Sequence, residues 1–230
     1  MFITWTALRA SEPRATSPWL PEGALFGQAG LAAAGRADLA SIDGRWWSVL
    51  GVWDDERSAR SAAPLAAEIG ADVWHVVMQP AAYRGDAVLC GGQRPFDTLP
   101  EEGKTTGASV VVTLAGLQAD AARTGEFFER FVELGRDVEQ APGNRATLVQ
   151  AADDGAVLTF SAWATLRDAV TWAYHRPEHA ATVRRQHEHA LATTSGFLRC
   201  AVVHSSGTLG STSDPLAGHR GTVVPRQERA

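Results

Sequence analysis

Four of the seven histidines lie within residues 174–190. This clustering makes the stretch the main candidate for a catalytic or metal-binding site. Imidazole titrates near neutral pH, so histidine serves both as a general acid or base and as a metal ligand. If Pro177 takes the first position of a helix, a stripe with helical spacing starts at His179. We therefore expect His179 to be the histidine that faces the interior. The stripe comprises His179, Val183, Gln186 and Ala190.

Charged neighbours extend this candidate site. Glu178 could act as a general acid or base, although an acidic residue in a first helical turn also complements the helix dipole. Arg184 and Arg185 could bind a carboxylate, although solvated arginines are commoner. His187 and His189 are two residues apart and do not face each other on a helix, which argues against a joint metal site. The plainer interpretation is a histidine-rich surface helix with one partly buried imidazole.

The rest of the chain excludes several classes of site. It has no Walker A loop, no GxGxxG after a strand, no HExxH and no GxSxG. Cys90 and Cys200 lie far apart, so neither a disulfide framework nor a thiolate zinc site is indicated, and both are expected to be small buried hydrophobes. With 26 acidic and 21 basic residues the formal charge is −5, which makes nucleic acid an unsuitable partner.

Composition indicates an ordinary globular protein. Of its 230 residues, 45% are hydrophobic and 20% are charged, which allows one large domain or two smaller ones, each with its own core. The first residues lack the pattern of a secretory signal, and no run approaches the roughly 20 apolar residues of a membrane span. We expect a cytoplasmic protein without stable membrane insertion that binds a small molecule.

Periodicity predicts the order β-α-β-β-α-β for the second half of the chain. The residues at 108–114 are mostly β-branched or apolar, as in a buried strand, and the phenylalanines at 127, 128 and 131 recur at helical spacing. Thr165 is a suitable helix N-cap, and Asp154-Gly155 between two apolar runs predicts a hairpin. The order is typical of a ferredoxin-like unit. Strands are expected at 108–114, 145–151, 156–164 and 197–204, and helices at 119–140, from 165 to Pro177, and at 177–191.

The first half of the chain is expected to repeat this order. Residues 50–54 resemble residues 159–164, each followed by a helical pattern, at an offset of about 110 residues. The second strand of this half is the weakest element and is placed within 37–42. Strands are further expected at 2–8, 46–53 and 71–79, and helices at 21–34 and 54–70.

The prediction is thus an α+β fold of two tandem ferredoxin-like repeats within one chain. The repeats occupy residues 1–82 and 108–205, joined by an irregular linker at 83–107. A polar tail follows at 206–230, with disorder expected over about the last 15 residues. Packing two open sheet faces together would bury both and leave a pocket between them. Eight tryptophans fit either core packing or the lining of such a cavity.

Several short motifs, taken together, resemble the spheroidene monooxygenase-like family. Its pattern of a TFSLW strand, an AxAY helix end, a P-x-H-x-x-x-x-R-R segment and a GTWGGxDPL tail has counterparts here in the same order. The family's LxVWEDE segment also has a counterpart in this chain. The matching residues are LTFSAW at 158–163, WAY at 172–174, PEHAATVRR at 177–185, GTLG at 207–210, DPL at 214–216 and LGVWDDE at 50–56.

The resemblance implies a dimeric α/β-barrel fold and a haem-dependent oxidative enzyme of bacterial secondary metabolism. It places the axial ligand of a haem b iron at His179, with His175 as the alternative. Arg184 or Arg185 would anchor a haem propionate. Glu178 and Trp163 are the candidate catalytic residues. The chain departs from the family after the Arg-Arg pair, where 187–200 lack its aromatic pair and acidic residues, so a different substrate or reaction is expected.

Other functions are compatible with the same residues. A cofactor-independent monooxygenase of the antibiotic-biosynthesis type would use the barrel without haem, and a haem-free dehydratase or isomerase would do so too. A non-enzymatic haem- or ligand-binding module would leave no open iron coordination site. Two repeats in one chain are compatible with a monomer, while exposed sheet edges could pair in a homodimer.

Overall fold

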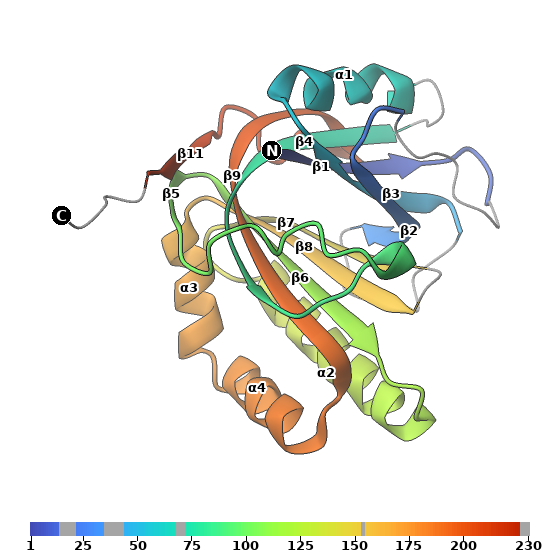
Figure 1. The fold of residues 1–230 in the computed structure, drawn as a ribbon, viewed down its shortest axis with the longest axis vertical. Helices are drawn as coiled ribbons and strands as arrows, with labels where there is room; N and C mark the ends of the chain where they lie inside the picture. The colour runs from blue at the N-terminus through green and yellow to red at the C-terminus, as the bar shows by residue number, and fades with distance from the viewer. Residues whose placement is uncertain (14–21, 35–43, 68–71, 153–154, 226–230) are drawn as a thin grey trace.

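Eight strands within the described residues close into one antiparallel barrel. The computed structural model describes residues 1–13, 22–34, 44–67, 72–152 and 155–225. Neighbouring strands follow the order β9-β4-β1-β3-β2-β7-β8-β6, and β6 pairs back onto β9 (Figure 1). The barrel therefore closes without a second copy of the chain. Its strands are β1 (Phe2–Arg9), β2 (Phe26–Ala34), β3 (Trp46–Trp53), β4 (Asp72–Gly85), β6 (Ser109–Leu117), β7 (Asn144–Ala152), β8 (Ala156–Trp163) and β9 (Ala192–Leu209).

The two halves of the barrel share one strand order. The first half reads β4-β1-β3-β2 and the second β9-β6-β8-β7, so the β4–β9 and β2–β7 pairings join them. The predicted mixed α+β class is confirmed. Every strand and helix predicted in the second half is present, and most ends shift only slightly, but the strand predicted at 197–204 extends five residues further at each end. The helices are α1 (Glu56–Ala67), α2 (Ala121–Glu139), α3 (Leu166–His175) and α4 (Pro177–His189).

The helix predicted at 21–34 is wrong, because strand β2 occupies its second part. Small residues there suggested a helix, but burial alternates along the strand, with Gln28, Gly30 and Ala32 buried. A Cβ atom on Gly30 would lie 2.3 Å from the Ala151 carbonyl oxygen on β7. The glycine therefore permits the close approach of the two half-barrels. The strand predicted within 37–42 lies outside the described residues, so a strict tandem ferredoxin repeat is not confirmed.

Large aromatic side chains fill the barrel interior. The Phe160 ring centroid lies 5.2 Å from that of Trp5 and 5.5 Å from that of Trp74, and all three side chains are fully buried. Phe96, from the segment between the halves, is also buried in this core. The interpretation of the space between the two sheets as a pocket is therefore wrong, since this space is packed core.

Asp214 holds the chain after β9 against the barrel. Its carboxylate accepts hydrogen bonds from Trp74 Nε1 at 2.8 Å, Ser205 Oγ at 2.7 Å and the Leu216 backbone N–H at 3.0 Å. Leu216 is fully buried in the barrel core. The DPL residues of the family resemblance therefore have a structural role here.

The segment between the halves and the C-terminal segment also pair with each other. Strand β5 (Lys104–Gly107) pairs with β11 (Gly221–Val224), while β10 (Thr212–Ser213) extends the edge of β9. A short 3₁₀ helix spans Cys90–Gly92. The expected disorder is wrong for 216–225, and 226–230 lie outside the described residues.

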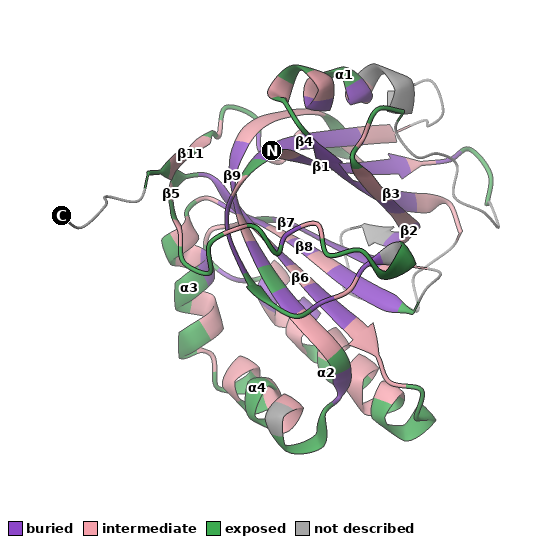
Figure 2. Cartoon of the chain, viewed as in Figure 1, coloured by how far each residue is buried: buried purple, intermediate pink, exposed green. Residues whose placement is uncertain are grey.

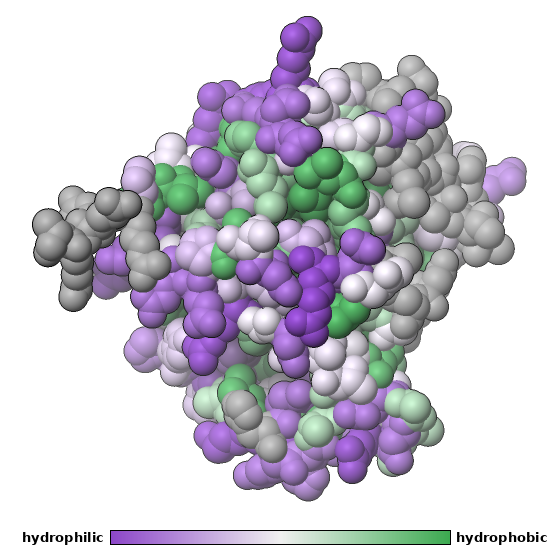
Figure 3. All heavy atoms as spheres, viewed as in Figure 1, coloured by the Kyte–Doolittle hydropathy of each residue, from purple (hydrophilic) through white to green (hydrophobic). Residues whose placement is uncertain are grey.

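The helices lie outside the barrel. Helix α1 covers the first half, where Ala59 and Ala62 pack on Trp53 and Val77. Helices α2 and α3 pack on the second half, whereas α4 has no buried residue among its described side chains (Figure 2). Hydrophilic side chains predominate over α4 on the face shown in Figure 3. Within the described residues, no helix combines the length and apolarity needed to cross a membrane.

Candidate functional site

Two consecutive helices, α3 and α4, carry the residues that the sequence singled out. Helix α3 begins where the Thr165 side chain accepts a hydrogen bond from the Asp168 backbone N–H, so the predicted N-cap is confirmed. Helix α4 begins with Pro177 in its first turn, after Arg176 in an extended conformation. Pro177 starts the new helix with its φ already set, so the chain turns between the helices and brings the start of α4 against the end of α3.

His179 is half-buried against α3. Its ring centroid lies 4.9 Å from that of Trp172, with 58° between the ring planes. Burial lowers the pKa of His179, and a hydrogen bond to the backbone of Ala173 offsets only part of that effect. The imidazole is therefore neutral at pH 7. A neutral imidazole with one ring N–H hydrogen-bonded keeps a lone pair on its other nitrogen, as a metal ligand requires.

Asp137 at the end of α2 fixes Trp172. Its Oδ2 atom accepts a hydrogen bond from Trp172 Nε1 at 2.7 Å and lies 3.6 Å from Arg176 Nε. Behind Trp172 lies Trp163, with ring centroids 5.9 Å apart. Trp163 is buried and donates its N–H to Ser161 Oγ at 3.0 Å. The structure thus connects two predicted site residues, Trp163 and His179, through Trp172, which sequence reasoning did not single out.

The other predicted site residues lie apart from this aromatic series. Arg185 Nε lies 2.5 Å from Glu126 Oε1 on α2, and Arg185 Nη1 lies 2.9 Å from His189 Nε2. This ion pair holds α4 to α2 and lowers the pKa of Glu126. Arg184, Glu178 and His175 are exposed, and the His175 Nδ1 atom lies 3.1 Å from the Thr171 carbonyl oxygen.

The outer face of the second half-barrel is incompletely covered beside these helices. Phe197 on β9 is 42% exposed, although its neighbour Leu198 is fully buried in the core. Val183, one turn after His179 on α4, is 40% exposed. Such partly exposed apolar side chains offer a surface to an apolar ligand.

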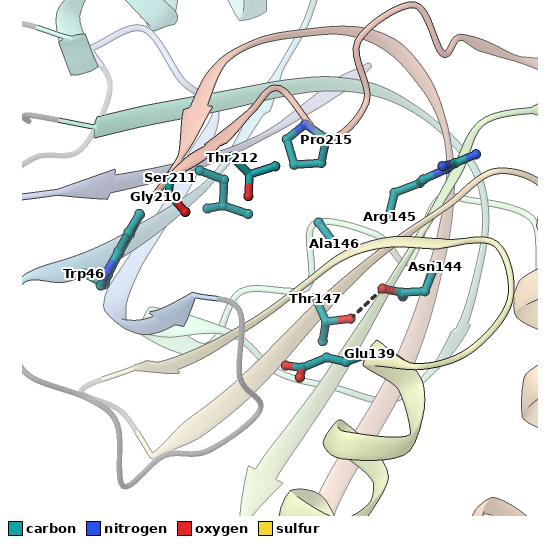
Figure 4. Close-up of a pocket in the computed structure, with 11 residues that line it drawn as sticks. Trp46, Glu139, Asn144, Arg145, Ala146, Thr147, Gly210, Ser211, Thr212 and Pro215 are labelled. Atoms are coloured by element: carbon teal, nitrogen blue, oxygen red, sulfur yellow. Dashed lines mark hydrogen bonds between the residues drawn. The ribbon is translucent and has the colours of Figure 1, made fainter.

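A cavity of about 370 Å³ lies elsewhere, at the end of the barrel where β3 and β7 begin (Figure 4). Trp46 flanks it on one side and Asn144 and Thr147 on the other, and the Thr147 hydroxyl donates to Asn144 Oδ1 at 3.4 Å. None of the predicted site residues lines this cavity. No group of three or more His, Cys, Asp or Glu side chains within the described residues could hold a metal ion.

The expectation that His179 is the histidine facing the interior is wrong, because His75 is far more buried. His75 is 1% exposed on β4, with Nδ1 at 2.8 Å from Thr6 Oγ1 and Nε2 at 3.0 Å from the Ala59 carbonyl oxygen. Both ring nitrogens are thus occupied, so His75 is a structural residue. The sequence signal for this burial was the position of His75 in a strand rich in β-branched residues.

The known proteins that resemble this chain do so in structure. No protein-family model matches the chain, and no curated protein matches its sequence. Two aldoxime dehydratase structures, one in complex with butyraldoxime, align with 97% of this chain. Their TM-scores are 0.51 and 0.52, at 11% and 12% identity over 84% and 82% of their own chains. A candidate monooxygenase from Fusobacterium nucleatum aligns over 93% of this chain and 97% of its own, with a TM-score of 0.43 and 8% identity.

These similarities bear on the fold alone, because all three identities are low. The two dehydratase structures cover nearly the whole described barrel and its helices. The resemblance to the spheroidene monooxygenase-like family stays a prediction that the sequence motifs carry. The chain has an α/β-barrel-type fold.

Proposed function

We propose that the chain is a haem-dependent enzyme that transforms a small organic substrate, with His179 as the axial ligand of the iron. The observation that carries this proposal is the state of His179: half-buried, neutral, and held by Trp172 and the Ala173 backbone. A neutral imidazole with one nitrogen hydrogen-bonded and the other free is the usual form of a haem ligand.

The described residues fit this group. Haem supplies four nitrogen ligands of its own, so one histidine suffices and no cluster of ligating side chains is needed. Val183, and Phe197 on the outer face of the second half, offer partly exposed apolar surface to a macrocycle. Cys200 is unsuited to bind the iron, because it is buried in the barrel core and burial raises the pKa of its thiol.

Each residue has a distinct part in the proposal. Bound haem would supply iron chemistry at a coordination position left open to a ligand. His179 would hold the iron, and Asp137 would keep Trp172 in place as the surface against which the imidazole is oriented. The exposed guanidinium of Arg184 is the better propionate anchor, because Arg185 already pairs with Glu126. Trp163 is buried, which leaves Glu178 as the more accessible of the two candidate catalytic residues.

We consider two reactions, one suggested by the sequence motifs and one by the structural similarity. The motif resemblance supports an oxidative reaction such as oxygen insertion. The similarity to aldoxime dehydratases supports testing dehydration of a small aldoxime, with butyraldoxime as the first substrate. A cofactor-free monooxygenase on the same barrel would instead be active as a colourless protein.

The test is an absorption spectrum of the full chain expressed with a haem precursor. His175→Ala is the matched control for His179→Ala, since His175 is exposed four residues earlier. We expect a Soret band in the wild type and in His175→Ala, and its loss in His179→Ala. If the wild type saturated with haem shows no specific band, or if His179→Ala keeps it, the proposed ligand is wrong.

A further inference from the structure

Three hydroxyl side chains lie on the outer face of the two central strands of the second half. Thr113 on β6 stands directly opposite Thr159 on β8, and Ser161 is two residues further along β8. Alternation places them on the outer side, because their sequence neighbours Val112, Leu158 and Phe160 are buried in the barrel core. The outer face of the sheet therefore has a polar centre on the side where the helices pack.

Among the described residues, one of the three hydroxyls makes side-chain hydrogen bonds. Ser161 Oγ donates to the Val111 carbonyl oxygen at 3.2 Å and accepts the Trp163 indole N–H at 3.0 Å. Thr113 and Thr159 make no side-chain hydrogen bond to any part of the chain that the structure describes, and both are half-buried. In an antiparallel pair the Cβ atoms of opposite residues lie about 5 Å apart, so one ligand atom can reach both hydroxyls.

Apolar side chains flank this threonine pair on both sides. Phe197 on β9 lies opposite Thr113, and Val149 on β7 lies opposite Thr159. The Phe197 ring is 42% exposed, whereas Val149 is fully buried with the phenylalanines of α2. These four residues form a row across β9, β6, β8 and β7. The row begins with an accessible aromatic ring, continues with two hydroxyls and ends with a covered apolar side chain.

On β9, the charged side chain next to this row is already engaged. Arg199, two residues after Phe197 on β9, donates from Nη2 to the Glu101 carbonyl oxygen at 2.9 Å. Two hydroxyls can donate and accept hydrogen bonds but cannot neutralise a charge, so they suit a neutral group that also does both. A hydroxyl or an oxime N–OH has this character.

We propose that Thr113 and Thr159 form the polar subsite of the substrate site, which binds a neutral hydroxyl or oxime group while the apolar body lies against Phe197. This inference rests on the proposed function, whose substrate it narrows to neutral, flat or short-chain molecules with one such group. The subsite explains why two hydroxyls stand half-buried and unused on an otherwise well-paired sheet.

Equilibrium dialysis of the full chain with two matched probes tests the subsite. The probes are 2-naphthol, which carries a hydroxyl, and 2-methylnaphthalene, which replaces it with a methyl group. Threonine to valine keeps the shape and suits a strand while removing the hydroxyl. We expect Thr113→Val and Thr159→Val each to weaken 2-naphthol binding about fivefold, as the loss of one neutral hydrogen bond does, and to change 2-methylnaphthalene binding less than twofold.

Two further variants serve as controls. Thr113→Ser restores a hydroxyl and should restore 2-naphthol binding to within twofold of the wild type. Thr222→Val removes an exposed hydroxyl on β11 and should leave both affinities unchanged. The proposal is overturned if the valine variants weaken both probes equally, if neither probe is affected, or if the wild type shows no saturable binding of 2-naphthol.

Measurement with and without added haem separates this inference from the proposed function. A His179-dependent Soret band without discrimination between the probes overturns the threonine subsite alone. Discrimination by the threonine pair without a His179-dependent Soret band overturns the haem proposal alone.

Discussion

The two halves of the barrel have the same strand order, but helices cover their outer faces to different extents. In the first half, α1 packs on the sheet and leaves His75 1% exposed beneath it. In the second half, three helices lie outside the sheet, yet Phe197 and Val183 are partly exposed and two threonine hydroxyls make no hydrogen bond to the described residues. Close coverage suits the first half to structural support, and incomplete coverage is the reason why the proposed ligand site lies on the second half.

The surroundings of His75 and His179 show this difference most clearly. His75 has both ring nitrogens occupied by Thr6 and Ala59, whereas His179 uses one hydrogen bond and rests on a tryptophan ring. We expect His75→Ala to lower the free energy of unfolding by about 4 kcal/mol, from a cavity and two unpaired polar groups. His179→Ala should cost about 1 kcal/mol or less. Urea denaturation of both variants measures the contrast, and equal losses would contradict it.

The pH dependence of stability sharpens the same contrast. Burial lowers the pKa of His75 to about 4, so the native state resists the proton that the unfolded chain binds near pH 6.5. Stability should therefore fall as the pH drops from about 6.5 to about 4, by roughly 3 kcal/mol in all. His75→Gln should flatten this slope. The lowered pKa of His179 acts in the same direction. An unchanged slope in His75→Gln would therefore mean that groups other than His75 cause the pH dependence.

Asp137 tests how the second half holds its open site. Asp137→Asn exchanges a charged acceptor of the Trp172 N–H for a neutral one and should cost about 1 kcal/mol of stability. It should also make Trp172 fluorescence easier to quench with acrylamide. Glu133→Gln on the same helix is the control, because its exposed pair with Arg130 contributes less than about 0.5 kcal/mol. If the two variants behave alike, Asp137 does not fix Trp172.

The smallest expected effect concerns the open face itself. Val183→Thr should change stability by less than about 0.5 kcal/mol, because the side chain is 40% exposed and both residues have similar helix propensity. The same substitution at Val77, which is fully buried under α1, should cost about 2 kcal/mol by burying an unpaired hydroxyl. Thermal unfolding distinguishes the two, and a comparable loss at Val183 would show that this face is covered.

The second half of the chain was predictable because its local signals agree. β-branched runs, phenylalanines at helical spacing, the Thr165 cap and Pro177 all point to the elements observed. Strand β2 in the first half was not predictable in the same way. Residues 26–34 are small enough to suit a helix, but they form a strand that pairs with β3 on one side and with β7, more than 110 positions later, on the other.

The candidate site divides in the same manner. The sequence alone identified the α3–α4 segment and singled out His179, since histidine spacing and Pro177 are local features. It could not identify Trp172, Asp137 or the threonine pair as parts of one face, because they come from four different elements.

The amino-acid sequence by itself determined the alternation of strands and helices, because periodicity is written into neighbouring residues. Only the tertiary structure decided which side of each strand is core. Trp5 and Trp74 point into the barrel, while Trp53 and Trp163 lie outside it under helices, although all four sit in similar apolar strands. The physical reason is closure: a strand offers two apolar faces, and long-range pairing around the barrel selects the one that turns inward.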